Sequence, residues 1–513
     1  MQTQPQRGSG RWWLPPLAEV VFVAVLLWVL VGGQARALLA DGDTGWHIRT
    51  GEYILAERRV PRVDLFSFSR PEAEWFAWEW ASDVLFALAH RAAGLEGVVL
   101  LSGALIAATS ARLFHFMIWQ RANVLVAVVT MLVATSASTV HWLARPHLFT
   151  SLLFVLSLGA LEADRRRPGR RAWTLVAVAV AWANLHGGFV ILPLTTALYA
   201  VAAACVALER GKPHDWRAAQ RYGFLTVAVA AATLANPYGY RLHVHIWKFL
   251  GADFIRKWVE EFQSPRFRGE SMLAFELLLL LGLLSVPWLW RQGEFATALL
   301  LVAMAHAALG SVRHVVLYVL AATPVVARRL SAALEALPGP WGQAIGSLVG
   351  DCAPRGRGPA RHRAPLWAAA ALALSAAVLD SGPSRWQIDF PKEKFPQAAL
   401  AATEKQLVGR RVLTSDQWAD YLIYRYYPEV RVFIDGRSDF YGRSIGQEYL
   451  DLMHAQHRWE ETLNRNGFDR ALLPPDWPLA TVLKAHPDWR LDYDDGQALL
   501  LRRVSRGSVS SVN

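Results

Sequence analysis

Long apolar runs separated by short polar stretches dominate the first three quarters of the chain. Residues 17–40 form a near-continuous apolar segment, long enough to cross about 30 Å of hydrocarbon. This segment is longer than the apolar region of a signal peptide and lacks a small-residue cleavage site, so we expect a retained membrane helix. Ten further apolar runs predict membrane helices at 94–118, 122–140, 147–161, 172–184, 187–208, 222–235, 272–290, 295–309, 314–327 and 366–379. The pattern predicts a polytopic α-helical membrane protein with about eleven transmembrane helices.

The pattern changes after residue 381, where the long apolar runs stop. Short segments rich in β-branched and aromatic residues now alternate with helical ones, which is typical of a small α/β layer domain. We expect strands at 411–415, 430–434, 469–473 and 498–501, and helices at 418–427 and 478–485. The sequence therefore predicts a transmembrane domain over 1–381 and a small C-terminal α/β soluble domain over 382–513.

Composition agrees with a membrane location. Of the 513 residues, 53% are hydrophobic and only 19% are charged, whereas soluble proteins carry about a quarter charged residues. This balance excludes intrinsic disorder and collagen-like repeats. The two cysteines, Cys205 and Cys352, lie in an apolar span and in a basic loop, which fits neither a zinc site nor a disulfide. The 23 tryptophans favour membrane interfaces, and we expect no nucleic-acid partner.

The net charge of +11 is not spread evenly, and its distribution orients the chain. Arginine and lysine cluster in three loops, at 165–171, 210–221 and 328–363. If Arg11 places the N-terminus in the cytoplasm, eleven alternating helices put all three loops on that side, as the positive-inside rule requires.

This orientation assigns the remaining loops to sides of the membrane. The stretch at 331–364, rich in Pro, Gly and Arg, is predicted to be a flexible cytoplasmic linker. The first loop, 41–93, and the C-terminal domain fall on the external face. Arginine- and alanine-rich usage suits a bacterial inner membrane, and this face would then be periplasmic.

The first external loop opens with Asp41-Gly-Asp43-Thr-Gly-Trp-His47-Ile-Arg49, directly after the first apolar segment. Two carboxylates two residues apart, with an imidazole four residues further on, can share a divalent cation or act as acid and base groups. Ionisable groups at membrane depth are costly and often functional. The alternative is structural: an Asp that caps a helix, followed by a Trp and an Arg at the membrane interface.

Aromatic residues follow in two external loops. In Trp75-Phe-Ala-Trp78-Glu79-Trp80, three tryptophans and one carboxylate could line a ligand surface, but an aromatic belt resting on lipid headgroups is favoured. The long loop 236–271 mixes aromatic and basic residues. It suits an interfacial helix touching lipid headgroups and a plain amphipathic surface helix equally well.

Polar residues also interrupt the external ends of other predicted membrane helices. The clearest interruption is Asn184-Leu-His186-Gly-Gly188, since two glycines at this depth let the backbone bend around a cavity. Each isolated His or Asn could also cap a helix end. Together they predict a polar, cationic cavity open to the exterior, suited to an anionic substrate such as a lipid phosphate. The residues concerned are His141, Arg145, His147, Asn184, His186, Gly187, Gly188, Asn236, Gly239, Arg313 and His314.

The first-loop pattern resembles that of GT-C glycosyltransferases, a superfamily that includes oligosaccharyltransferases and protein mannosyltransferases. These polytopic enzymes take a sugar from a polyprenyl phosphate or pyrophosphate carrier on the external face. The chain is also similar to a poorly characterised bacterial branch of this superfamily. That similarity rests on Trp78-Glu79-Trp80, Asn184 to Gly188, Asn236 to Gly239, Arg313-His314, and Val432 to Arg437 with Asp439 and Tyr441. The resemblance implies an enzyme that moves a sugar from a lipid-linked donor to a glycan, lipid or protein acceptor.

The resemblance also implies roles for single residues. In the family an external-loop Asp is the acceptor's base or a metal ligand, and by position this is Asp43 first and Asp41 second. Attack on an anomeric carbon needs a carboxylate to take a proton and cationic help for the departing phosphate. The candidate catalytic residues are Asp43, Asp41 and Glu79, with a divalent metal at Asp41 and Asp43 left open and no other cofactor expected. The candidate substrate-binding residues are His47, Arg49, Arg145, His147, His186, Arg313 and His314.

The tail departs from one branch of the family and carries a motif of its own. It lacks the Trp-Trp-Asp motif of oligosaccharyltransferases, so asparagine-linked transfer is not expected. Asp435-Gly436-Arg437 follows a predicted strand, a usual place for ligand contacts. A salt-bridged turn is favoured there, with acceptor recognition as the alternative.

Two other function classes fit the same residues. A transporter or flippase for a lipid-linked or anionic solute would also use a cationic cavity and a broken helix. An envelope scaffold would bind a partner through its tail. The chain shows no internal repeat, and its polar groups gather on one predicted face, which favours the enzyme.

Overall fold

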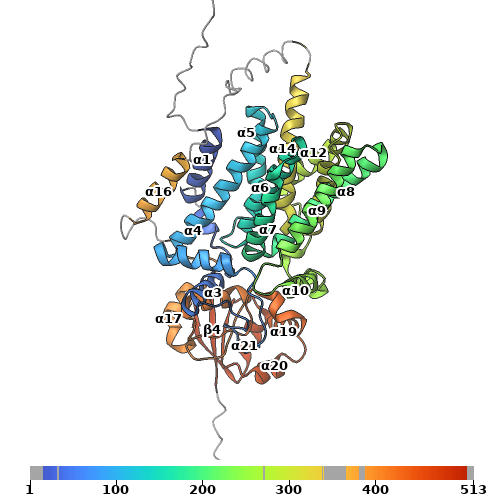
Figure 1. The fold of residues 1–513 in the computed structure, drawn as a ribbon. Coiled ribbons are helices and arrows are strands. Elements are labelled where there is room, and N and C mark those ends of the chain that lie inside the picture. The colour runs from blue at the N-terminus through green and yellow to red at the C-terminus, as the bar shows by residue number, and fades with distance from the viewer. Residues whose placement is uncertain are drawn as a thin grey trace, which may run out of the picture.

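The computed structural model describes residues 16–31, 34–269, 272–337, 339, 366–380 and 388–504. Figure 1 shows a bundle of long helices standing side by side, with a smaller α/β domain packed against one end. The predicted linker at 331–364 lies mostly outside these residues. Its first part, 331–335, is helical and forms the end of the helix that begins at Val315.

The long helices coincide with the predicted apolar runs. They are α1 (Leu17–Val31), α4 (Trp80–Trp119), α5 (Val124–Ser138), α6 (His147–Arg166), α7 (Thr174–Leu185), α8 (Ile191–Arg210), α9 (Pro213–Ala232), α12 (Met272–Arg291), α13 (Phe295–Gly310), α14 (Val315–Glu335) and α16 (Leu366–Asp380). Among the described residues, six helices are long and apolar enough to cross a membrane: α4, α5, α6, α8, α12 and α14, some with an adjoining 3₁₀ turn. The polytopic helical class is therefore confirmed, while the count of eleven crossings stays a prediction.

Helix α4 bends where its membrane run was predicted to begin. Ala93 and Gly94 have non-helical backbone angles, and Gly94 has a φ of 61°, which glycine adopts without steric strain. The segment before the bend turns across the end of the bundle, and the segment after it runs along the other helices (Figure 1). The 94–118 prediction therefore began at the right residue.

Charged side chains from the three basic loops meet at the end of the bundle opposite the α/β domain. Arg165 lies 3.3 Å from Glu294, and Arg328 lies 2.6 Å from the other oxygen of the same carboxylate. Arg221 pairs with Asp164 at 2.5 Å. The basic residues thus share one end, as the positive-inside argument required; which side of the membrane this end faces stays a prediction.

Short elements fill the junction between the bundle and the domain. They are α2 (Gln34–Ala37), α3 (Asp43–Glu57), η1 (Thr139–His141), η3 (Gly187–Val190), α10 (Tyr240–Leu250), α11 (Asp253–Trp258), η4 (Glu260–Phe262) and η5 (Val312–His314); η2 (Arg170–Trp173) precedes α7. Helix α10 exposes Tyr240, Val244 and Trp247, the last to 80%. An exposed apolar face at the rim of the bundle supports the interfacial-helix interpretation of the 236–271 loop.

The C-terminal domain contains one four-stranded sheet with helices around it. Its elements are α17 (Gln397–Leu407), β1 (Val412–Leu413), α18 (Asp416–Tyr426), α19 (Ser438–Met453), α20 (Trp459–Asn466), β2 (Arg470–Leu473), α21 (Pro478–Ala485), β3 (Trp489–Asp494) and β4 (Leu499–Arg503). The strand order is β1-β2-β4-β3, with β1 parallel to β2 and the other pairs antiparallel.

Most of the elements predicted for this domain are present. Three predicted strands and both predicted helices match β1, β2, β4, α18 and α21. The strand at 430–434 is wrong. There Val432 makes only isolated bridges, to Val412 and to Ser67 of the first external loop, because that loop lies where a neighbouring strand would pair. The half-exposed edge strand β3 was missed, since charged residues interrupt its apolar pattern.

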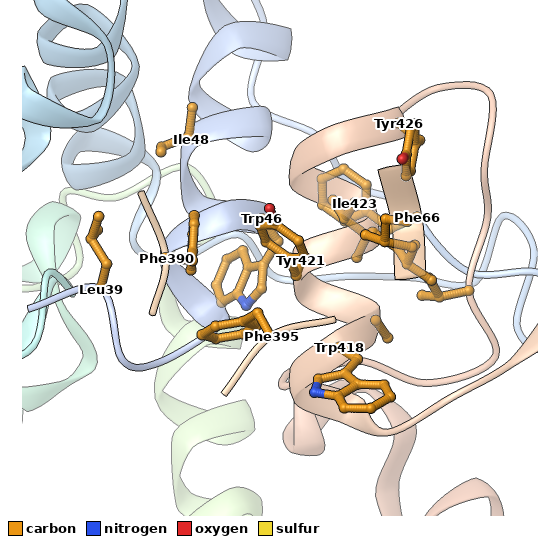
Figure 2. Close-up of a cluster of buried hydrophobic side chains, with 14 of the residues drawn as sticks. Leu39, Trp46, Ile48, Phe66, Phe390, Phe395, Trp418, Tyr421, Ile423 and Tyr426 are labelled. Carbon is orange, nitrogen blue, oxygen red and sulfur yellow. The ribbon is translucent and has the colours of Figure 1, made fainter. Parts of the chain in front are cut away.

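One hydrophobic cluster joins the first external loop to the C-terminal domain. In Figure 2, Trp46 of α3 lies among Phe390, Phe395 and Tyr421 of the domain, and all four side chains are buried. Aromatic residues of this size dominate core energetics, at roughly 25 cal/mol per Å² of buried apolar surface. The loop is therefore packed into the domain as part of its core, and both parts can contribute to one site.

Candidate active site

A cavity of about 1010 Å³ lies between the bundle and the C-terminal domain. Its walls come from the start of α3, from the loops before α4 and α6, from the first turns of α6, α8 and α14, from η3, α10, α11, η4 and η5, and from the domain. Nine of the ten residues predicted to form the site line it: Asp41, Asp43, His47, Glu79, Arg145, His147, His186, Arg313 and His314. Helix ends far apart in the sequence therefore converge as expected.

Arg49 is the exception, and its predicted role in substrate binding is corrected. Its Nε donates to the backbone carbonyl of Tyr424 at 2.8 Å, and its Nη1 pairs with Glu52 at 2.6 Å. The bond to Tyr424 ties α3 to α18 of the C-terminal domain, and the pair with Glu52 lies within α3. Arg49 lies two helical turns from Asp43 on the face that packs against the domain, so it holds the loop in place instead of lining the cavity.

Asp41, Asp43 and Glu261 surround the guanidinium of Arg145. Nη1 of Arg145 lies 2.9 Å from Asp41 Oδ2 and 2.5 Å from Glu261 Oε1, and Nη2 lies 2.8 Å from Asp43 Oδ2. Burial alone would lower the pKa of Arg145, but the three carboxylates hold it well above its ordinary value. Arg145 is therefore a fixed cation beside Asp43. Asp43 lies in the first turn of α3, where the helix dipole also stabilises a negative charge.

The arrangement does not fit the divalent metal that the sequence left open at Asp41 and Asp43. Both carboxylates point their Oδ2 atoms at a guanidinium, and this cation already occupies the space between them. Within the described part of the chain, no group of three or more His, Cys, Asp or Glu side chains is placed to hold a metal ion. Arg145 supplies the positive charge at this position.

The protein raises the pKa of Asp43 above that of an ordinary aspartate. Its side chain is 6% exposed, and this burial raises its pKa to about 7, against the opposing effect of Arg145. Asp41 and Glu261 add to the rise. A carboxylate with a pKa near neutrality is ionised often enough to act as a base and basic enough to accept a proton.

A second group of titratable residues lies along the same wall. Asp83 Oδ1 is 2.6 Å from Nδ1 of His47, whose Nε2 faces Glu79 Oε2 at 3.8 Å. The other oxygen of Glu79 lies 3.3 Å from Nε2 of His186. Burial raises the pKa of Glu79 to about 8, although Arg145 counteracts it, so Glu79 is neutral at pH 7.

Hydrogen bonds fix the tautomer of His186. Its Nδ1 accepts the Gly188 N–H at 2.9 Å and the Thr150 hydroxyl at 2.8 Å, while that hydroxyl oxygen accepts the indole N–H of Trp182. The imidazole proton is therefore on Nε2, directed at Glu79. The Asn184–Gly188 break thus bends the backbone around a cavity, as predicted.

The tryptophans of the Trp75–Trp80 segment do not form the aromatic belt that the sequence favoured. Trp75 is 3% exposed. Trp78 lines the cavity and packs on His245 and Phe249, and Trp80 donates to Asn184 Oδ1 at 2.8 Å. The C-terminal domain contacts Trp75 through Arg437, α10 contacts Trp78 and α7 contacts Trp80, and the sequence could not reveal these contacts.

The predicted positive charge of the cavity is also corrected. Nine acidic side chains line it against four basic ones. Arg145 is neutralised by three carboxylates. Arg313 is the less committed cation: its Nε is 3.5 Å from Glu261, and its guanidinium stacks on Phe262 at 4.5 Å from the ring centre. His147 and His314 each bond a backbone carbonyl.

Sequence reasoning missed residues that only the fold brings to the site. Asp83 and Glu261 gave no spacing signal. The Asp-Gly-Arg motif was noticed, and the salt-bridged interpretation is the better one: Arg437 is buried and bonds Asp435 at 2.6 Å and Asp64 of the first loop at 2.8 Å. This pair fastens the domain to the loop that carries Asp43.

Comparisons with known proteins complete the description. No protein-family model and no curated protein sequence matches the chain. Its structure is similar to the archaeal oligosaccharyltransferase AglB from Archaeoglobus fulgidus, in complex with an inhibitory peptide and a dolichol-phosphate. The TM-score is 0.53 at 11% identity, over 94% of this chain and 73% of AglB. It also matches ArnT from Cupriavidus metallidurans, bound to undecaprenyl phosphate, with a TM-score of 0.44 at 16% identity over 95% of this chain and 98% of ArnT.

AglB shares the layout seen here, in that the likeness spans both the helical bundle and the C-terminal domain of this chain. The chain therefore has the fold of the oligosaccharyltransferase AglB, as expected from its resemblance to the GT-C glycosyltransferases.

Proposed function

We propose that the protein is a membrane glycosyltransferase that moves a sugar from a polyprenyl-phosphate donor to an acceptor. The observation that carries the proposal is Asp43, a buried carboxylate that lines the cavity with its pKa raised to about 7. The bound dolichol-phosphate of AglB supports a lipid-linked donor. We further infer a bacterial inner-membrane location, a cytoplasmic N-terminus and a periplasmic C-terminal domain.

In the proposed reaction Asp43 takes the proton of the acceptor hydroxyl. The acceptor oxygen bonds to the anomeric carbon as the bond from that carbon to the phosphate oxygen breaks, and the electron pair leaves with the phosphate. Arg313 is the candidate to bind the departing phosphate, because its ion pair with Glu261 at 3.5 Å is longer than the three ion pairs of Arg145, at 2.5 to 2.9 Å. The protonated Glu79, which faces the Nε2–H of His186, can donate a hydrogen bond to the sugar.

The rest of the cavity suits a lipid-linked sugar. Side chains of the bundle, α10 and α11 give one side an apolar surface next to Arg313, where an isoprenoid chain could lie. These residues are Val190, Ile191, Leu250, Phe254, Val316 and Leu317. The C-terminal domain adds polar residues to the lining, among them Gln417, Ser438 and Asp439, and we assign these to the acceptor.

The test compares a deletion strain carrying the wild-type protein with one carrying Asp43→Asn at matched membrane levels. Mass spectrometry of envelope glycans and polyprenyl-linked sugars is the readout. Asp253→Asn is the control, since that side chain is 94% exposed on α11. If the protein is a transferase, we expect only the strain with Asp43→Asn to lose one glycan residue and to accumulate the lipid-linked donor. Unchanged glycans and lipids would refute it and favour the transporter or scaffold.

A further inference from the structure

Gly436 of the C-terminal domain faces the carboxylate of Asp43. A Cβ at this position would overlap Asp43 Oδ1 and lie 3.0 Å from Oδ2 of Asp420 in α18. Both oxygens are buried, and neither has a hydrogen-bond partner among the described residues. The two carboxyl groups therefore both lie beside Gly436. Asp43 Oδ1 occupies the space that a side chain at position 436 would need.

Asp420 is built tightly into this contact. Its side chain is fully buried, and its Oδ1 accepts the N–H of Gly436 at 3.1 Å. A Cβ on Gly42 would lie 2.8 Å from the Asp420 side chain, and one on Gly45 would lie 2.7 Å from its carbonyl. Glycines on both sides thus let the start of α3 approach α18 closely, and Asp420 is held behind Asp43.

We propose that Asp420 and Gly436 form a seat that fixes the Asp43 carboxylate, so that the C-terminal domain is part of the catalytic site. This rests on the proposed role of Asp43 as the base. Asp43 lines the cavity and Asp420 does not, so Asp420 acts through Asp43 and is a positioning residue. The Asp435–Arg437–Asp64 ion pairs hold the backbone of this seat against the first external loop.

The chemistry of the pair agrees with this geometry. Two carboxylates in one buried site cannot both be ionised, and burial followed by the charge of Asp43 raises the pKa of Asp420 well above its ordinary value. The proton therefore resides on Asp420. An O–H on Asp420 Oδ2, which lies beside the same Gly436 position as Asp43 Oδ1, is then available to donate to Asp43 together with the indole N–H of Trp46, while Arg145 holds Asp43 Oδ2 at 2.8 Å. Other charged groups facing Asp43 are Asp41, Glu79 and Glu261.

Gly436→Ala is the steric test. The new methyl group must push the Asp43 carboxylate aside by about 1 Å, and misplacement on this scale costs about a hundredfold in rate. Gly223→Ala is the matched control, because a Cβ there meets nothing within 4 Å. The assay follows conversion of the lipid-linked sugar that accumulates in the deletion strain, using permeabilised membranes. If Asp420 and Gly436 fix the Asp43 carboxylate, Gly436→Ala should have a kcat near 1% of wild type and a KM within threefold of it. An unchanged kcat for Gly436→Ala overturns the proposal.

Asp420→Asn and Asp420→Ala form the second test, read as a pH–rate profile. Asn keeps both bonds, since its carbonyl accepts from Gly436 and its amide N–H faces Asp43 Oδ1, so activity stays within a few-fold of wild type. Ala removes the donor, which moves the acid limb of the profile to higher pH. A limb that stays in place would show a purely structural Asp420, and a limb moving to lower pH would show a charged one. Either result overturns the seat.

The two proposals fail differently. If Asp43→Asn is inactive while the Gly436 and Asp420 variants behave like wild type, the transferase stands and the seat is wrong. If Asp43→Asn retains full activity, the proposed base is wrong, whatever these variants do.

Discussion

Asp43→Asn should stabilise the protein at alkaline pH while it abolishes activity. The folded protein holds the Asp43 proton with a pKa of about 7, against an ordinary value of 3.8. Below pH 4 both the folded and the unfolded chain are protonated at this residue, so the substitution changes little. Between pH 4 and pH 7 the unfolded chain releases its proton first, and the free energy of unfolding of the wild type falls as pH rises. Above pH 7 the loss is complete.

The size of the effect follows from the shift. About three pKa units, at about 1.4 kcal/mol each, make the ionised Asp43 cost roughly 4 kcal/mol at pH 8. Asparagine does not titrate and escapes this cost. If the entropy of unfolding scales with chain length, 1 kcal/mol moves the melting temperature of this chain by about 1 °C. The variant should therefore melt about 4 °C above the wild type at pH 8 and level with it near pH 4.

The assay is thermal unfolding of the purified protein in detergent, followed by tryptophan fluorescence from pH 4 to pH 9. It needs no substrate. Asp253→Asn serves as control and should show no pH-dependent difference, because its side chain is 94% exposed. If Asp43→Asn melts at or below the wild-type temperature at pH 8, the ion pair with Arg145 keeps the pKa of Asp43 near its ordinary value. The argument for Asp43 as a base would then fail.

Three further predictions concern other charged residues at the junction. Glu79, whose pKa is raised to about 8, should react with a hydrophobic carbodiimide at pH 6.5 and resist it above pH 9, as mass spectrometry of labelled peptides would show. Arg145→Ala leaves Glu261 and its neighbouring carboxylates without their cation; Mg²⁺ should raise the melting temperature of this variant and leave the wild type unchanged. Arg437→Met leaves the buried Asp64 without its cation, which should lower the free energy of unfolding by about 3–5 kcal/mol. Hydrogen exchange should then be faster where the first external loop contacts the C-terminal domain.

Much of the fold could be predicted because its signals are local. A membrane run of apolar residues declares itself within about 20 positions, and each predicted run coincides with a helix. The bend in α4 falls on Gly94, a residue whose backbone freedom is visible in the sequence. The strand at 430–434 failed for the opposite reason. Its pairing depends on the first external loop, more than 350 residues away, and Val432 bonds Phe66 there instead of a full neighbouring strand.

In the candidate site, too, only the residues with a local sequence signal could be predicted. His186 and Asp43 were recognisable because unusual residues stood beside glycines at the ends of apolar runs. Asp420 and Asp83 were not, since each lies inside an ordinary amphipathic helix, and only tertiary packing brings it to His47 or Asp43. The net charge of a cavity is equally non-local, because it sums side chains from every wall.

Protonation reconciles an acid-lined cavity with an anionic donor. Nine carboxyl side chains would repel a lipid phosphate if all were ionised, yet burial keeps Glu79 neutral at pH 7 and Asp43 half protonated. Asp41 and Glu261 are offset by Arg145. Arg313, with one ion pair at 3.5 Å, is then a cation that can bind the phosphate of the proposed donor. A departing phosphate gains negative charge next to Arg313 while Asp43 gains a proton, so the reaction leaves the total charge of the buried site unchanged. Low-dielectric sites favour steps of this kind, because they require little reorganisation of fixed charges.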